Sequence, residues 1–110
     1  MVRGAMGEEG WQMLYLRLCF DRSSAAWLRK SLREKHRAYL RAHVGKLQAV
    51  EVVMAGPLCV SDADDTNLAS MMVLEAGALD EVLSFHRRDP FTEGGLYERV
   101  DIHRWDKHLG

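Results

Sequence analysis

The order of hydrophobic periodicities along the chain constrains its fold more than any other feature. Residues 11–20 alternate in polarity as a strand does, and residues 24–43 and 78–88 carry apolar stripes at helical spacing. Residues 47–55, 70–76 and 96–105 are rich in strand-forming side chains, and an acidic stretch at 61–67 is predicted to be a solvated turn. The resulting order βαββαβ predicts an α+β, ferredoxin-like fold with a four-stranded antiparallel sheet and both helices on one face.

The first strand has two different faces. One face is purely apolar and carries Leu14, Leu16, Leu18 and Phe20. The other face is mixed, with Trp11, Met13, Tyr15, Arg17 and Cys19. We expect the mixed face, together with Tyr97 and Trp105, to lie on the side of the sheet away from the helices. Exposed aromatic side chains there suggest that another surface covers this face. A homodimer formed by face-to-face packing of two sheets is the simplest covering.

Composition limits the classes of partner. The chain has 110 residues and 47% hydrophobic content, which is enough for one core, so residues 11–107 are predicted to form a single domain and residues 1–10 a flexible tail. With 15 basic and 16 acidic side chains the net charge is -1, which favours neither nucleic acid nor a membrane surface as a partner. Two distant cysteines and the absence of a signal-peptide pattern favour the cytoplasm.

His36 occupies a position of the predicted first helix where the pattern of apolar residues predicts a leucine. At 100° per residue it shares the inner stripe with Leu28, Leu32 and Leu40, and Arg33 lies one turn earlier on the shoulder of that stripe. An inward-facing histidine can be a satisfied structural residue, or it can line a site and move protons near neutral pH. The four arginines of this helix are predicted to form a solvated face; they are Arg29, Arg33, Arg37 and Arg41.

Asp89 ends the second helix, because the residue before Pro90 is pushed out of the helical region. A carboxylate at a helix C-terminus is disfavoured by the helix dipole and needs a donor or cationic partner. His36 could be that partner and would then be fixed in one tautomer. His86 could compete for Asp89, and Arg87 or Arg88 could instead pair with it without any chemistry.

Three further residues are candidates for contact with a ligand. Arg33 and Ser70 could bind a polar substrate oxygen, and Gly56 would let the backbone approach a ligand closely. No flavin, nucleotide or haem motif is present, so no cofactor is expected. The histidines and cysteines lack zinc-site spacing, and the aspartates at 62–65 lack the glycine and glutamate of a calcium loop, so no metal is expected.

Four segments resemble the YciI-like family, or YCII-related domain, over residues 13–107. They are the helix Arg33-x-x-His36-Arg-Ala-Tyr-Leu, the strand end Ala55-Gly56-Pro57-Leu58, the strand opened by Ser70, and Asp89-Pro90-Phe91 followed by Gly95-Leu96-Tyr97. The resemblance implies a dimeric α+β barrel with a His-Asp dyad at His36 and Asp89 and a pocket serine at Ser70. His86 departs from what the family pattern leads us to expect.

The resemblance also implies an activity. Dehydrochlorinase-like elimination has been assigned within this family, and related dimeric barrels isomerise lactones or oxidise polyphenols. We therefore expect a cofactor-free lyase or isomerase in which His36 and Asp89 perform general acid/base chemistry on a small ring or carbonyl metabolite. The alternative is a non-catalytic module that binds a small ligand or serves as a dimeric interaction scaffold.

Overall fold

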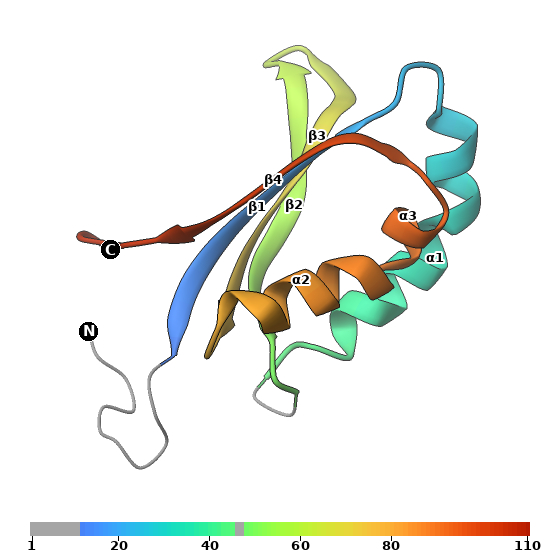
Figure 1. Cartoon of the computed structure of the whole chain (residues 1–110). Helices are drawn as coiled ribbons and strands as arrows, with labels where there is room; N and C mark the ends of the chain where they lie inside the picture. The colour runs from blue at the N-terminus through green and yellow to red at the C-terminus, as the bar shows by residue number, and fades with distance from the viewer. Residues whose placement is uncertain (1–11, 46–47) are drawn as a thin grey trace.

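The structure, a computed structural model, describes residues 12–45 and 48–110. Its elements are β1 (Met13–Asp21), α1 (Ala26–Arg41), β2 (Glu51–Ser61), β3 (Asp64–Ala76), α2 (Leu79–Arg88), α3 (Pro90–Glu93) and β4 (Tyr97–Trp105). The strands form one antiparallel sheet in the order β2-β3-β1-β4, and the helices lie on one of its faces (Figure 1). The predicted α+β, ferredoxin-like fold is confirmed. The predicted tail at residues 1–10 lies outside the described residues.

The predicted orientation of β1 is wrong. Tyr15, Arg17 and Cys19 are buried under the helices, whereas the leucines of β1 lie on the open face and are half-buried. The reason lies in β3, where Leu74 and Met72 stand opposite Tyr15 and Arg17 and supply the apolar surface that the helices cover. Alternation in one strand defines two faces, but the neighbouring strand decides which of them becomes the core.

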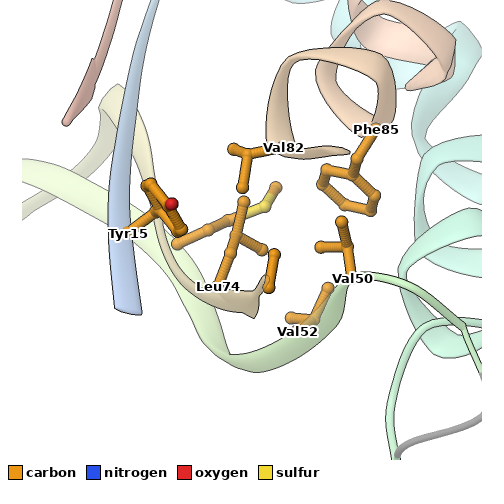
Figure 2. Packing of buried hydrophobic residues seen from close by; sticks show 8 residues of the cluster. Tyr15, Val50, Val52, Leu74, Val82 and Phe85 are labelled. Atoms are coloured by element: carbon orange, nitrogen blue, oxygen red, sulfur yellow. The ribbon is translucent and has the colours of Figure 1, made fainter. Parts of the chain in front are cut away.

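Two groups of buried side chains hold the helices on the sheet. The larger group lies between α2 and the sheet and includes Tyr15, Leu74, Val82 and Phe85; Figure 2 shows Val82 pointing from α2 toward Leu74 and Phe85 pointing toward Val50. The smaller group consists of Ala25, Phe91 and Leu96, with Leu28 and Leu32 of α1 packed against it. This second group brings α3 against α1. It therefore fixes the distance between the inner face of α1 and the residues around Pro90.

The middle hairpin is longer than predicted. The acidic stretch expected to be a turn is mostly strand, because β3 begins at Asp64 and only Asp62 and Ala63 connect the paired residues Ser61 and Asp64. The residues here are exposed, so polar side chains fit a strand without any cost of burial. Hydrophobic periodicity cannot detect a strand that has no buried face.

The end of α2 follows the prediction, and a short helix that was not predicted comes directly after it. Asp89 has an extended conformation, with φ -63° and ψ 127°, as expected for a residue before proline. Pro90 then opens α3, where its fixed φ suits the first helical position. The Asp89 side chain accepts a hydrogen bond from the Phe91 N–H and caps this new helix.

Candidate active site

A cavity of about 500 Å³ lies between α1 and strands β2 and β3. Four of the five predicted site residues line it, namely Arg33, His36, Gly56 and Ser70. The fifth, Asp89, is fully buried and contacts His36 instead of the cavity. The fold thus gathers residues from α1, β2 and β3 around one space, with a carboxylate buried next to its histidine.

His36 and Asp89 are directly hydrogen-bonded. Nδ1 of His36 lies 2.7 Å from Oδ1 of Asp89, and the imidazole stacks on the Phe91 ring at 3.8 Å between centroids. With Asp89 ionised, Nδ1 of His36 carries a proton and donates a hydrogen bond to the carboxylate, so the neutral ring has an unprotonated Nε2. His36 lines the cavity, and Nε2 is the ring nitrogen left to accept a proton there.

Asp89 stays ionised although its side chain is fully buried. Oδ1 accepts hydrogen bonds from His36 and from the Phe91 N–H (2.9 Å), and Oδ2 accepts one from Nη2 of Arg17 (2.9 Å). Burial alone would raise the pKa of Asp89, but the His36 hydrogen bond and the Arg17 charge outweigh it and hold that pKa below its usual value. A carboxylate that stays ionised can orient the imidazole and stabilise its protonated form.

Arg17 is a buried residue of the site that the sequence did not predict. It lies on β1, one of the two inner strands, its side chain is fully buried, and it forms an ion pair with Asp89. The sequence offers Arg87 or Arg88 as a possible ion partner of Asp89, and Arg17 takes that place in the structure. Nη1 also approaches Sδ of Met72 at 3.3 Å. A buried arginine on a strand is itself a signal, but the predicted orientation of β1 placed it on the open face.

His86 does not compete with His36 for Asp89. Its Nδ1 lies 3.4 Å from Oγ1 of Thr92, and its ring is stacked near Tyr97. Burial and the positive charge of Arg17 lower the pKa of His86 to about 4, so this residue is neutral at neutral pH. The question raised by the two histidines is therefore answered by geometry, because only His36 is within hydrogen-bond distance of the acid.

Arg29 connects β1, α1 and β3, which corrects the prediction that it lies on a solvated face. Its Nε and Nη2 donate to the two carboxylate oxygens of Asp21 at 2.7 and 3.0 Å, and Nη2 also donates to Oγ of Ser70 at 2.9 Å. Because Ser70 accepts this hydrogen bond, its own O–H is free to donate toward the cavity. Arg29 also lies over the Phe91 ring, 4.8 Å from its centroid.

Gly56 keeps the strand side of the cavity open. A Cβ built on this residue would meet no atom within 4 Å, so any side chain there would project into free space. Gly56 is part of the cavity wall, and a larger residue would reduce the volume available to a ligand. Neither the packing of the protein nor the backbone conformation requires glycine here, so its effect is on the space left for a ligand.

The described residues offer neither a reactive buried thiol nor a cluster of metal ligands. Burial raises the pKa of the Cys19 thiol to about 11, so this cysteine is protonated and unsuited to act as a nucleophile. Among residues 12–45 and 48–110, no three metal-ligating side chains lie together. Within the same ranges, no helix is long and apolar enough to cross a membrane.

Comparisons with known proteins identify the family and the fold. The model of the YCII-related domain matches residues 13–106. A solved structure of 5-chloro-2-hydroxyhydroquinone dehydrochlorinase (TftG) from Burkholderia phenoliruptrix, in complex with 2,5-dihydroxybenzoquinone, is 31% identical with a TM-score of 0.73. The match covers 87% of this chain and 96% of that one.

Two other solved structures are more distant. The protein PA3566 from Pseudomonas aeruginosa is 12% identical with a TM-score of 0.49, over 89% of this chain and 95% of that one. Ribosomal protein S6 from Thermotoga maritima is 16% identical with a TM-score of 0.43, over 86% and 88%. No curated protein has a sequence significantly similar to this chain.

The buried ion pair leads to a prediction about stability. Arg17→Met leaves Asp89 without its cation, and Asp89→Asn leaves Arg17 without its anion, so each change should lower the free energy of unfolding by roughly 3–5 kcal/mol. The double variant Arg17→Met/Asp89→Asn removes both charges and should lose clearly less than the sum of the two, as measured by urea unfolding. Additive losses would show that the two charges do not stabilise each other.

The lowered pKa of His86 leads to a prediction about pH. The folded protein resists protonation of His86 until about pH 4, whereas the unfolded chain takes up that proton near pH 6.5. Stability should therefore fall as the pH drops from about 6.5 to 4, and His86→Gln should make this loss smaller in urea unfolding at pH 7, 5.5 and 4.5. Arg41→Gln, at an exposed position near the end of α1 that carries no group titrating in this range, is the control, and equal slopes for both variants would contradict the assignment.

Proposed function

The chain belongs to the YCII-related domain family, and from that premise we propose that it is a small-molecule enzyme that transfers protons through His36. The observation that carries this proposal is the 2.7 Å hydrogen bond between His36 and the buried Asp89, made by a histidine in the wall of a cavity. A structural histidine needs no cavity beside it. A histidine held in one tautomer, with its second nitrogen available to a ligand, is suited to general acid/base catalysis.

The proposed reaction begins when Nε2 of His36 takes a proton from the substrate, either from a ring hydroxyl or from a carbon beside a carbonyl group. A proton taken from a carbon beside a carbonyl group leaves its electron pair in a new C=C bond, and the carbonyl π electrons move onto oxygen to give an enolate. The enolate re-forms the carbonyl group and expels a halide from the neighbouring tetrahedral carbon, which completes an elimination, or it takes the proton back at another carbon, which completes an isomerisation. A proton taken from a ring hydroxyl leaves its pair on oxygen; the phenolate then takes up a proton at the halogen-bearing carbon, and the halide leaves as a second hydroxyl gives up its proton. Each route moves protons and requires no oxidant.

Each side chain around His36 has a separate role in this proposal. Asp89 orients the imidazole and compensates for the charge that His36 gains with the proton. Arg17 is a positioning residue, because it holds the second oxygen of Asp89 and keeps the carboxylate ionised. Ser70 and Arg33 face the cavity and would bind the oxygen on which negative charge develops.

The related dehydrochlorinase supports elimination as the reaction class. Removal of hydrogen chloride from a hydroxylated ring needs a base for the proton and space for the ring, which are what His36 and the cavity offer. At 31% identity the two proteins share a family and a fold. Small lactones, catechols and halogenated hydroquinones are the compounds to test first.

The role of His36 is tested by its removal. Within this compound panel, His36→Gln should lower turnover of any substrate by roughly 100- to 10,000-fold, the usual contribution of general acid/base catalysis. His43→Gln is a matched control, because His43 lies just past the end of α1, contacts Tyr39 and Phe85, and does not line the cavity. If His36→Gln and wild type turn over a substrate at equal rates, His36 is not the catalyst. Binding without turnover in wild type would favour a ligand-binding module.

We also propose that a second copy of the chain covers the open face of the sheet. The leucines of β1 are half-buried on this face, while Met54 and Trp105 are 57% and 41% exposed. A second cavity of about 500 Å³ lies here, lined by Leu14, Met54, Val73 and Trp105 among others. Exposed apolar surface of this kind on a central sheet is typical of an interface.

The proposed dimer is tested by a charge in the middle of this face. Leu16 stands between Val73 and His103, so Leu16→Lys should bury an unpaired charge in the dimer and convert it to a monomer of 12.5 kDa in light scattering. Trp27→Lys is the control, because Trp27 is 70% exposed on α1, on the helical side of the sheet. A wild-type monomer at micromolar concentration would refute the dimer.

A further inference from the structure

We propose that His86 is a positioning residue for His36 and acts only while its imidazole is neutral. Its effect passes through Thr92 and Arg17 to the carboxylate of Asp89. His86 is half-buried in the last turn of α2 and does not line the cavity, so it has no direct contact with a ligand there. The contacts are independent of any reaction, whereas their value for catalysis rests on the proposed function.

The hydroxyl group of Thr92 joins Arg17 to His86. Nη2 of Arg17 donates to Oδ2 of Asp89 at 2.9 Å and to Oγ1 of Thr92 at 3.4 Å, so its two N–H groups serve two acceptors. Oγ1 of Thr92 also lies 3.4 Å from Nδ1 of His86. Because this oxygen accepts from Arg17, its own O–H is left to donate to Nδ1, which must then carry no proton. Hydrogen bonds of 3.4 Å are weak, so we expect an effect on position and not on the fold.

Arg17 depends on such contacts because its side chain is fully buried. Its guanidinium lies 5.7 Å from the ring centroids of both Phe85 and Tyr97, and these rings offer it no oxygen of a carboxylate or carbonyl group. Asp89 and Thr92 supply oxygen acceptors to the same nitrogen, Nη2. A change at Thr92 therefore alters how Arg17 holds Asp89, and with it the imidazole that Asp89 orients.

The surroundings of His86 keep its imidazole neutral at pH 7. Burial and the positive charge of Arg17 lower its pKa to about 4, Arg87 of the same helix acts in the same direction, and Asp89 opposes them. On the side of β4 the ring is stacked near Tyr97, whose hydroxyl group stays neutral because burial raises its pKa. Nδ1 of His86 is therefore available as an acceptor at neutral pH and is lost as an acceptor in acid.

Protonation of His86 reverses the direction of its contact with Thr92. An imidazolium carries a proton on both ring nitrogens, so Nδ1 becomes a second donor toward an oxygen that already accepts from Arg17. Two positive charges then face one neutral hydroxyl group in a region closed to water. Repulsion between them weakens the hold of Arg17 on Asp89, which is why only the neutral form of His86 can act as a positioning residue.

Nuclear magnetic resonance of the Nδ1–H that His36 donates to Asp89 tests the inference without any substrate. At pH 7, His86→Leu removes the acceptor, and this proton should exchange with water roughly 2- to 5-fold faster than in wild type, as expected for the loss of one weak hydrogen bond. His86→Gln keeps a neutral acceptor and should restore the wild-type rate. His103→Gln, at an exposed position of β4, is the control and should leave the rate unchanged.

Thr92→Val tests the route, because it removes the hydroxyl group and keeps the shape of the side chain. It should accelerate exchange as much as His86→Leu does, and the double variant His86→Leu/Thr92→Val should exchange no faster than either single variant. Multiplied effects in the double variant would show that His86 does not act through Thr92 and would overturn the inference.

Acidification tests the condition of neutrality and needs only wild type and His86→Gln. As His86 takes up its proton toward pH 4, the ratio of the wild-type exchange rate to that of His86→Gln should rise in step with the titration of His86. Circular dichroism restricts the comparison to pH values at which both proteins are folded. A constant ratio across this titration, or equal rates for wild type and His86→Leu at pH 7, would overturn the inference.

Failure of this inference differs from failure of the proposed function. Turnover that depends on His36, together with an exchange rate that is indifferent to His86, would support the enzyme and refute the positioning role. An exchange rate that depends on His86, without turnover of any ring compound, would support the positioning role and refute the enzyme.

Discussion

The carboxylate of Asp89 joins three elements of this molecule. It accepts hydrogen bonds from Arg17 of β1, from His36 of α1 and from the N–H of Phe91 of α3, while the Asp89 backbone ends α2. A charged group without access to water is costly, and it is retained only where a counter-charge and hydrogen bonds compensate for desolvation. The arrangement of the three elements around Asp89 is therefore a condition for its burial, and the fold and the candidate site depend on the same contacts.

The position of this carboxylate follows from the proline after it. Pro90 forces Asp89 into an extended conformation, which stops α2 and turns the side chain toward the N–H groups of the helix that Pro90 opens. As a result Phe91 lies beneath the imidazole of His36, and Leu32 of α1 packs against the same buried group as Phe91. A restriction on one peptide unit thus sets the relation between α1 and α3, and with it the distance from His36 to its acid.

The sequence predicted those parts of the site that depend on local rules. The inner position of His36 follows from helical spacing, and the need of Asp89 for a partner follows from its place at a helix end before proline. The role of Arg17 could not be predicted, because alternation in β1 leaves open which face the helices cover, and because Arg17 and Asp89 are 72 positions apart. The role of Arg29 was missed for a similar reason, since its partner Asp21 lies at the end of another element, β1.

The charges on the two sides of His36 have different consequences for a reaction. Behind the ring, Arg17 and Asp89 together are neutral, so the imidazole is oriented by a carboxylate whose charge is already balanced. In front of it, Arg33 and Arg37 add positive charge to the cavity. A proton taken up by Nε2 therefore increases an existing excess of positive charge unless the ligand is negative. An anion bound to Arg33 removes that obstacle, and binding and proton transfer must then favour each other, because a coupling free energy between two events acts equally in both directions.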